Sequence, residues 1–302
     1  MRDRLHRYWS YIAYRFRKRW NTIQNIPITI DRAVSYFIFL LKIKTVNKES
    51  NNTINQVFYR KQFVAHGKYH LPYPNNSLVL YKELIEKGFG IIECDVMFTK
   101  DSIPILCHDL SLSNVARDRQ GKYVDIEISK LRYSKIEQYN FSIEGDSYLP
   151  VSTLKDMLSL AKRHNVCIEL DLNKKYLGRK KCKKLYNMVK NAGMLQNVIW
   201  EVFPGDFYSL AILDQNLIYQ FDNTWDKKKI DRIIEIKDYA SLIILSQWFP
   251  DSVSGPYNEI IEYGHLNGFL MKCATLNNYS DVDYMFSNGV DLITTDTLSN
   301  KY

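Results

Sequence analysis

Two carboxylates and a histidine stand close together in an otherwise apolar part of the sequence. Residues 91–97 predict a buried strand, and Glu93 and Asp95 share one of its faces because side chains alternate along a strand. Buried carboxylates need compensation, and a hard divalent cation such as Mg²⁺ or Ca²⁺ is a natural partner for them. A second apolar run, 103–107, ends at His108. The alternative interpretation is an edge strand whose acids face water.

Similar residues stand at the ends of other predicted strands. His66 ends an apolar run near residue 64, and Asp296 ends the last one near residue 293. Glu169 and Asp171 share a face of a predicted strand at 166–171. Several carboxylates and two histidines at one place suffice for metal-assisted acid–base chemistry.

Eight predicted strands, most of them separated by helices, can bring these ends together. The strands lie near residues 64, 93, 168, 200, 219, 243, 270 and 293. Repeated strand–helix units imply a parallel sheet. Eight units predict an α/β fold of the closed (β/α)₈ TIM-barrel type, whose active site lies at the C-terminal ends of the strands.

Local signals mark the ends of the intervening helices. Ser152 and Thr153 are predicted to cap the helix that follows them. Gly88, Gly193 and Gly264 are predicted to end three other helices.

Residues 1–56 predict a basic helical extension and linker, and 57–302 predict the barrel. The first twenty residues carry seven basic side chains against one acid, a net charge of +6 within a chain total of +8. The remainder is close to neutral, which argues against a nucleic-acid-binding body.

Residues 4–24 of this extension show an amphipathic pattern with a basic side. Such a helix can lie on an anionic membrane surface, or it can pack on the barrel. The apolar residues 33–41 are too short to span a bilayer and predict a buried helix or a second interfacial segment. Because the chain ends too early for a full eighth barrel helix, the N-terminal helices are also candidates to cover that gap.

The cysteines and the absence of an export signal bear on location. The five cysteines are an odd number without CxxC spacing, so a disulfide framework or zinc site is not expected and a reducing compartment fits best. No cleavage site for a secretory signal follows the apolar run. We therefore expect a cytoplasmic protein, peripheral at the inner membrane face if the basic helix binds lipid.

Taken together, these motifs resemble the glycerophosphodiester phosphodiesterase family over about residues 60–298. The most distinctive are Ala65-His66-Gly67, Glu93-Cys94-Asp95-Val96 and His108-Asp109. Further similar stretches lie at 74–77, 149–154, 168–170 and 289–296. No single stretch is specific, whereas their order and spacing are.

The resemblance implies roles for five residues. Glu93, Asp95 and Glu169 would hold one divalent cation, Mg²⁺ or Ca²⁺. His66 and His108 would act as general acid and base. The family's fold is the (β/α)₈ barrel that the strand count predicts independently.

The chain departs from the family pattern where phosphate is contacted. Gly67 replaces the arginine that usually follows the first histidine, and Asp171 replaces a lysine that usually follows the third-strand glutamate by two residues. Asp171 would then be an extra metal ligand or a partner of Lys272. The residues that we expect to contact phosphate or substrate instead are Lys68, His70, Asp171 and Lys272.

The sequence thus predicts a metal-dependent phosphodiesterase that cleaves a glycerophosphodiester-like bond. Its phosphodiester substrate would be a lipid derivative or a teichoic-acid-like or capsule-like polymer. The alternative is a catalytically impaired barrel that serves as a membrane-associated binding module, suggested by the missing arginine and lysine.

Overall fold

The computed structural model describes most of the chain beyond residue 61. The described residues are 30, 31, 33–36, 38, 39, 62–113, 115–142, 148–172, 176–249, 253 and 255–299. The amphipathic segment 4–24 lies outside them.

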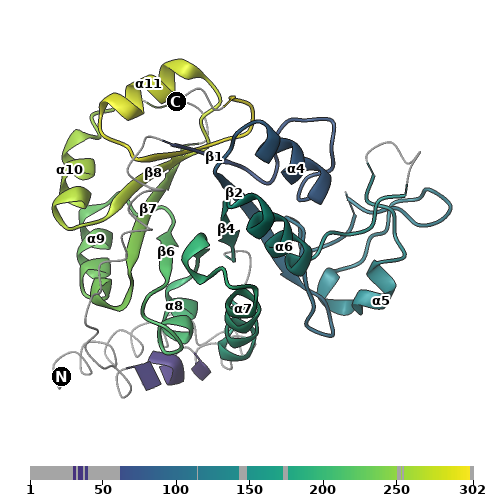
Figure 1. The fold of residues 1–302 in the computed structure, drawn as a ribbon. Helices are drawn as coiled ribbons and strands as arrows, with labels where there is room; N and C mark the ends of the chain where they lie inside the picture. The colour runs from purple at the N-terminus through teal and green to yellow at the C-terminus, as the bar shows by residue number, and fades with distance from the viewer. Residues whose placement is uncertain are drawn as a thin grey trace, which may run out of the picture.

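Within these residues, eight parallel strands form a closed barrel, because β1 pairs with both β2 and β9. Going round, the order is β1-β9-β8-β7-β6-β5-β4-β2, and the short β3 pairs antiparallel with β2 outside the ring. The barrel strands are β1 (Gln62–Ala65), β2 (Ile91–Phe98), β4 (Cys167–Asp171), β5 (Val198–Glu201), β6 (Ile218–Phe221), β7 (Leu242–Trp248), β8 (Leu270–Ala274) and β9 (Leu292–Thr295), with β3 at Pro104–Leu106. The predicted TIM barrel is confirmed (Figure 1).

Alternation along the strands divides the barrel interior into layers. The lower layer is an apolar floor, formed by Val64, Ile91, Cys167, Ile199, Ile218, Ile244 and Leu292. Two residues further along, the inward positions of β2, β4 and β5 carry acidic side chains. The floor therefore seals the barrel below a polar layer that opens at the C-terminal strand ends.

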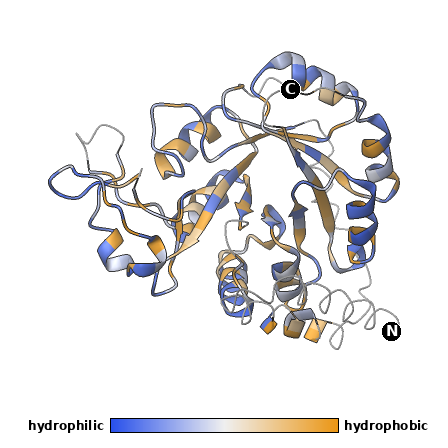
Figure 2. Ribbon diagram, turned by 180° about the vertical axis from the view of Figure 1, so that it is seen from behind, coloured by the Kyte–Doolittle hydropathy of each residue, from blue (hydrophilic) through white to orange (hydrophobic). Residues whose placement is uncertain are grey.

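Helices surround the barrel and bury their apolar faces on the outer side of the strands (Figures 1 and 2). They are α4 (Leu78–Glu86), α6 (Leu154–His164), α7 (Arg179–Ala192), α8 (Pro204–Ala211), α9 (Lys227–Ile234), α10 (Asn258–Leu266) and α11 (Tyr279–Ser287), with the 3₁₀ turns η3 (Leu195–Asn197) and η4 (Lys237–Tyr239). Helix α5 (Tyr133–Ile136) and the 3₁₀ turn η2 (Ile128–Lys130) lie apart from the barrel. Burial of these apolar stripes stabilises the fold by roughly 25 cal/mol per Å² removed from water.

Most of the predicted helix signals act as expected. The Thr153 hydroxyl accepts the Asp156 backbone N–H at 3.2 Å and caps α6. Gly193 ends α7 in the left-handed region with φ +70°, where the missing side chain avoids a steric penalty.

The prediction that Gly264 ends its helix is wrong. Helix α10 continues through it to Leu266, and the chain turns at Gly268 with φ +82°. A Cβ on Gly264 would lie 2.2 Å from the Met271 sulfur. The glycine is therefore needed for close packing of the helix on β8 rather than for a turn.

Between β3 and α6 the chain builds an extension with its own small core. Helix α5 and turn η2 lie in this part, which projects from the side of the barrel (Figure 1). Its core includes Leu112, Ile128, Ile136 and Val151, all buried. The extension holds β3 in place and so supports the residues that follow it.

The described part of the N-terminal extension packs on α8 (Figure 1). Tyr36 contacts Tyr208 edge-on with ring centroids 4.9 Å apart, and Phe39 contacts Tyr239 at 4.7 Å. Helix α8 lies across the ring from the β9–β1 seam. The prediction that this segment fills the gap left by the eighth helix is therefore wrong for the described residues, because these aromatic side chains bury against α8 and η4.

Two further findings bear on the sequence predictions. All five cysteines are buried and none forms a disulfide. Among the described residues, no helix combines the length and the apolar character needed to cross a bilayer.

Candidate active site

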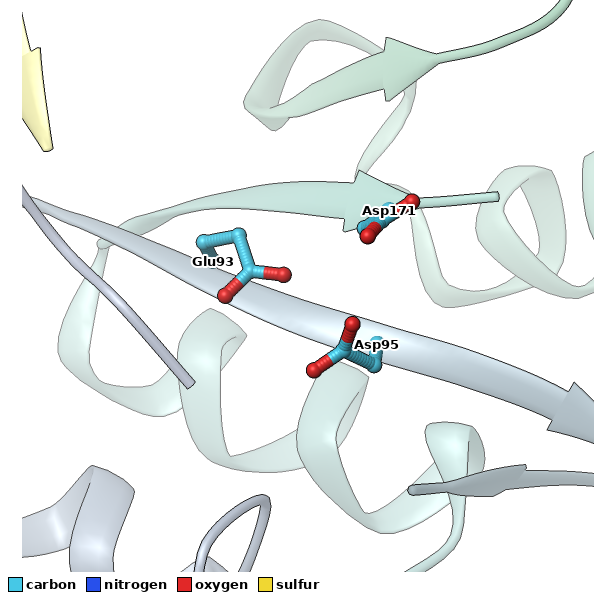
Figure 3. Close-up of side chains that lie close together, drawn as sticks. All are labelled: Glu93, Asp95 and Asp171. Atoms are coloured by element: carbon cyan, nitrogen blue, oxygen red, sulfur yellow. The ribbon is translucent and has the colours of Figure 1, made fainter. Parts of the chain in front are cut away.

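Three buried carboxylates converge where the middle of β2 lies beside the C-terminal end of β4. Glu93 and Asp95 come from β2 and Asp171 ends β4, and one oxygen of each lies within 4.8 Å of the others. Figure 3 shows the three side chains turned toward one another from neighbouring strands. Their residues are only 4%, 0% and 7% exposed, so water does little to screen the negative charges.

The strand register explains this convergence. In the β2–β4 pair, Glu93 stands beside Glu169 and Asp95 beside Asp171. Four acids therefore occupy neighbouring inward positions on two hydrogen-bonded strands. Burial and the nearby Asp95 carboxylate raise the pKa of Glu93 well above its usual value, which reflects the concentration of negative charge.

Asn76 fixes the orientation of Asp95. Its amide donates to Asp95 Oδ2 at 2.8 Å, and its carbonyl oxygen accepts the Asp95 backbone N–H at 2.9 Å. Tyr81 donates to the same carbonyl oxygen at 2.7 Å. Asn76 adopts φ +58°, a conformation that asparagine tolerates better than most residues.

Glu169 makes a different set of contacts. Lys272 on β8 donates to its two oxygens at 2.5 and 2.6 Å, across 103 residues of sequence. Gln220 on β6 also donates to Glu169, at 3.2 Å. Burial opposes the charge on Lys272, but the neighbouring Glu169 carboxylate raises the lysine pKa. The buried glutamate is therefore neutralised from within the barrel.

Two acids in this mouth were absent from the sequence prediction. Glu201 ends β5, and Gln220 donates to it at 2.7 Å and to Asp222 at 3.1 Å. Burial and the adjacent Asp222 raise the pKa of Glu201 well above normal. Both acids stand at the ends of apolar runs, so the rule that identified Glu93 could have identified them.

His66 follows β1 and faces the acid cluster. Its Nδ1 lies 2.6 Å from Asp296 Oδ1, and its Nε2 lies 3.8 Å from Glu93 Oε2. Burial alone would lower the His66 pKa, but the Glu93 carboxylate and the Asp296 hydrogen bond raise it to about 9. Asn277 holds Asp296 from the other side at 3.1 Å. Asp296 thus orients the ring, with Nε2 directed toward the acids.

His108 is held in a similar way. Its Nδ1 lies 2.7 Å from Asp109 Oδ1. The preceding Cys107 donates its backbone N–H to the Asp95 carbonyl at 3.1 Å, which holds the chain before this histidine against β2. Both predicted catalytic histidines therefore have an aspartate partner at Nδ1.

Gly67 occupies a tight position beside the cluster. Its backbone N–H donates to Glu93 Oε2 at 2.6 Å. A Cβ at this position would lie 3.0 Å from both Asn76 Oδ1 and Glu93 Oε2. The glycine lets the backbone approach the carboxylate, and an arginine here would require its neighbours to shift.

The predicted phosphate contacts lie in different environments. Lys68 and His70 follow His66 in the loop after β1, half-buried and exposed respectively. Asp171 lies within the acid cluster, and Lys272 lies deep in the barrel with Glu169. The loop residues are therefore the more accessible of the predicted contacts.

The cluster suits a hard divalent cation. Its donors are carboxylate oxygens, which Mg²⁺ and Ca²⁺ prefer. Among the described residues, Lys272 is the only lysine or arginine buried in the barrel interior, and it donates hydrogen bonds to Glu169. A divalent cation would offset the remaining carboxylates. The His66 imidazole, 3.8 Å from Glu93, lies close enough to this cluster for proton transfer.

Comparisons with known proteins identify the family to which the chain is similar. Residues 66–299 match the model of a family described as the glycerophosphoryl diester phosphodiesterase family. A curated relative, glycerophosphodiester phosphodiesterase 1 of Bos taurus, is 23% identical over 58% of this chain, which spans 55% of that relative's length. The protein YqiK of Bacillus subtilis is 24% identical over 74% of this chain and 90% of its own.

Solved structures share the fold at low sequence identity. A glycerophosphoryl diester phosphodiesterase from Silicibacter pomeroyi superposes with a TM-score of 0.65 at 18% identity, covering 79% of this chain and 90% of its own. A phosphodiesterase from Oleispira antarctica, solved with the product sn-glycerol-3-phosphate, gives 0.64 at 19% identity, covering 79% of this chain and 94% of its own.

Proposed function

We propose that this chain, which belongs to the glycerophosphoryl diester phosphodiesterase family, is a hydrolase. Its substrate is a glycerophosphodiester-like bond, and it uses one divalent cation. The observation that carries this proposal is the buried acid cluster with the aspartate-held His66 beside it. His108, also held by an aspartate, follows Cys107, whose backbone N–H bonds to the Asp95 carbonyl. The Bos taurus relative, of which this chain spans about half the length, is named glycerophosphodiester phosphodiesterase 1.

The acids of β2 and β4 supply the cation site in this proposal. Glu93 and Asp95 provide two carboxylates, and β4 provides a third. A cation bound there would polarise a phosphoryl oxygen and neutralise charge that develops on it. The backbone N–H of Gly67 and the amide of Asn76 keep the two β2 carboxylates in place.

The two histidines transfer the protons. Asp296 and Asp109 engage Nδ1 of His66 and His108, so Nε2 is the nitrogen of each ring that would exchange a proton with the substrate. One imidazole activates the attacking water or substrate hydroxyl, and the other protonates the leaving alkoxide. Lys68 and His70, in the loop after β1, contact the phosphate or the leaving group.

Hydrolysis assays on the purified full chain test the proposal. The substrates are glycerophosphocholine, glycerophosphoethanolamine, a lysophospholipid and a glycerol-phosphate polymer, each with Mg²⁺, with Ca²⁺ and with chelator. We expect chelator-sensitive turnover of at least one substrate. His66→Ala and His108→Ala should each lower kcat by about 10²- to 10⁴-fold, the usual contribution of a general acid or base.

His265→Ala is the matched control, because this histidine pairs with Asp291 before β9, at the opposite end of the barrel. It should leave kcat unchanged. Full activity in both His66→Ala and His108→Ala would exclude the proposed mechanism. Analysis of products by ³¹P NMR distinguishes hydrolysis from formation of a cyclic phosphate.

A second candidate function follows from Gly67, whose surroundings leave little room for a phosphate-gripping arginine. A barrel without catalysis could act as a binding module at a membrane. Absence of both divalent-cation binding and turnover of any tested substrate would favour this module, whereas cation binding without turnover would point to an untested lipid or polymer substrate. The two histidine–aspartate pairs favour catalysis, because binding alone does not need them.

The basic segment 4–24 would bring the barrel to an anionic membrane surface on the cytoplasmic side. Its charge carries this part of the proposal. Co-sedimentation of the full chain with phosphatidylserine vesicles, compared with phosphatidylcholine vesicles, tests it. Equal binding to both would reject the electrostatic contact.

A further inference from the structure

The two acids of β4 differ in what they face. Glu169 and Asp171 are both inward residues of the same strand, two positions apart. Asp171 turns toward Glu93 and Asp95 (Figure 3). Glu169 turns to the far side of the barrel, where it meets β6 and β8. Only one of the two is therefore grouped with the acids of β2.

Lys272 saturates its hydrogen bonds inside the barrel. Its ammonium group has three N–H donors, and three acceptors surround it: both oxygens of Glu169 and, at 3.1 Å, the Gln220 carbonyl oxygen. The side chain is 1% exposed, so water does not compete for these contacts. The ammonium therefore has no donor left for a phosphate group.

The same contacts make Glu169 a poor cation ligand. Both of its oxygens accept from Lys272, and one also accepts from Gln220. A divalent cation on this carboxylate would lie close to the lysine ammonium in a poorly screened interior, where like charges repel strongly.

We propose that the divalent cation is bound by Glu93, Asp95 and Asp171, and that Lys272 is a positioning residue that keeps Glu169 out of the ligand set. This inference rests on the proposed function, because it concerns the same cation. It differs from the set that the family resemblance implies, in which Glu169 is the third ligand. A lysine on β8 and an aspartate at 171 replace the family's lysine at position 171, so the third carboxylate moves two residues along the strand.

Cation binding by the full chain, measured calorimetrically with MgCl₂ and with CaCl₂, tests the ligand set without a substrate. Loss of a metal's outer-shell partner alone typically costs about 10- to 100-fold in affinity. We therefore expect Asp171→Asn to weaken binding at least about tenfold. The matched control is Glu169→Gln/Lys272→Met, which removes the other acid of β4 together with its charge partner and should weaken binding far less.

A rescue experiment separates positioning from simple structural support. In Asp171→Asn/Lys272→Met, Glu169 is released from the ammonium and can turn to the cation, so binding should recover most of what Asp171→Asn loses. A residue that only stabilised the fold would give no such recovery. Circular dichroism shows whether each variant is folded.

The outcomes distinguish this inference from the proposed function. If the wild-type chain binds the cation and Glu169→Gln/Lys272→Met weakens binding as much as Asp171→Asn does, the ligand assignment is wrong. The cation-dependent function would still hold in that case. Folded Asp171→Asn/Lys272→Met without recovery would overturn the role of Lys272. No binding of either ion by the wild-type chain would overturn both the inference and the cation requirement of the proposed function.

Discussion

Glu93 and Glu169 stand side by side in the register of β2 and β4, yet their surroundings differ. Glu169 has an ammonium and an amide within hydrogen-bond distance, and its charge is balanced by Lys272. Glu93 has a backbone N–H from Gly67 and a histidine 3.8 Å away, while Asp95 and Asp171 add further negative charge.

The difference separates a charge pair that is balanced inside the barrel from a group of three acids whose negative charges lie close together. A buried pair must satisfy both charges to persist, and the pair on β4 and β8 does so. Burial and, after it, the nearby Asp95 carboxylate raise the pKa of Glu93 well above its usual value. The second group is therefore the one that a cation stabilises.

Breaking the balanced pair should have the largest effect. Lys272→Met leaves Glu169 buried without its counter-ion, which we expect to lower the free energy of unfolding by about 3–5 kcal/mol. Urea denaturation in the presence of chelator measures this loss. Glu169→Gln/Lys272→Met should recover most of it, because no uncompensated charge remains. An equal loss in both variants would mean that packing, rather than charge, makes the lysine important.

Binding a cation to the other group should have the next largest effect. A ligand at one hundred times its Kd stabilises a protein by about 2.7 kcal/mol when it binds only the folded state. We expect the melting temperature to rise with Mg²⁺ or Ca²⁺ and to fall back with chelator. The rise should persist in the Glu169→Gln/Lys272→Met variant, where the balanced pair is gone. If the rise in melting temperature disappears in that variant, the cation binds at Glu169 rather than at Glu93, Asp95 and Asp171.

The two groups also differ in how far they could be predicted from the sequence. The barrel follows from the eight apolar runs and their helices, and Glu93, Asp95 and Asp171 follow from alternation at the ends of two runs. The partner of each acid cannot be predicted from this alternation. Lys272 lies 103 residues from Glu169, and only the closed ring of strands brings them together.

Other features depended on tertiary packing in the same way. Gly264 resembles a helix stop, but close contact with Met271 is its reason for being there. The extension that contains α5 folds around its own core, which the sequence analysis did not predict. Phe39 is apolar in any context, and the sequence alone could not place it against Tyr239.

Removing one charge from the group of Glu93, Asp95 and Asp171 should change the free energy of unfolding in the opposite direction to Lys272→Met. Asp171→Asn in chelator should raise the free energy of unfolding by about 1 kcal/mol, a fraction of the roughly 3 kcal/mol of repulsion between unit charges about 5 Å apart at an effective dielectric constant near 20. Urea denaturation measures it. With saturating cation the same substitution should destabilise instead, since it removes a ligand. Destabilisation under both conditions would show that the three acids do not repel one another in the cation-free protein.

A charge pair at the opposite end of the barrel should have the smallest effect, because water screens it. His265 Nε2 lies 2.9 Å from Asp291 Oδ2, with both side chains partly exposed. The hydrogen bond to Asp291 is the main cause of the raised His265 pKa, and partial burial opposes it. A raised folded-state pKa means that the pair stabilises fully below the unfolded value near 6.5 and loses this contribution as pH rises through the folded value.

His265→Gln should therefore cost more stability at pH 5.5 than at pH 8.5, by about 0.2–1 kcal/mol, the range for exposed ion pairs. Melting temperatures of the two proteins at both pH values measure the difference, and 1 M salt should reduce it because it screens charges beyond about 3 Å. Asp291 also accepts the Met271 backbone N–H at 2.7 Å, a contact that His265→Gln keeps. A cost independent of pH would therefore assign the role of His265 to packing, whereas the barrel mouth would still depend on charge.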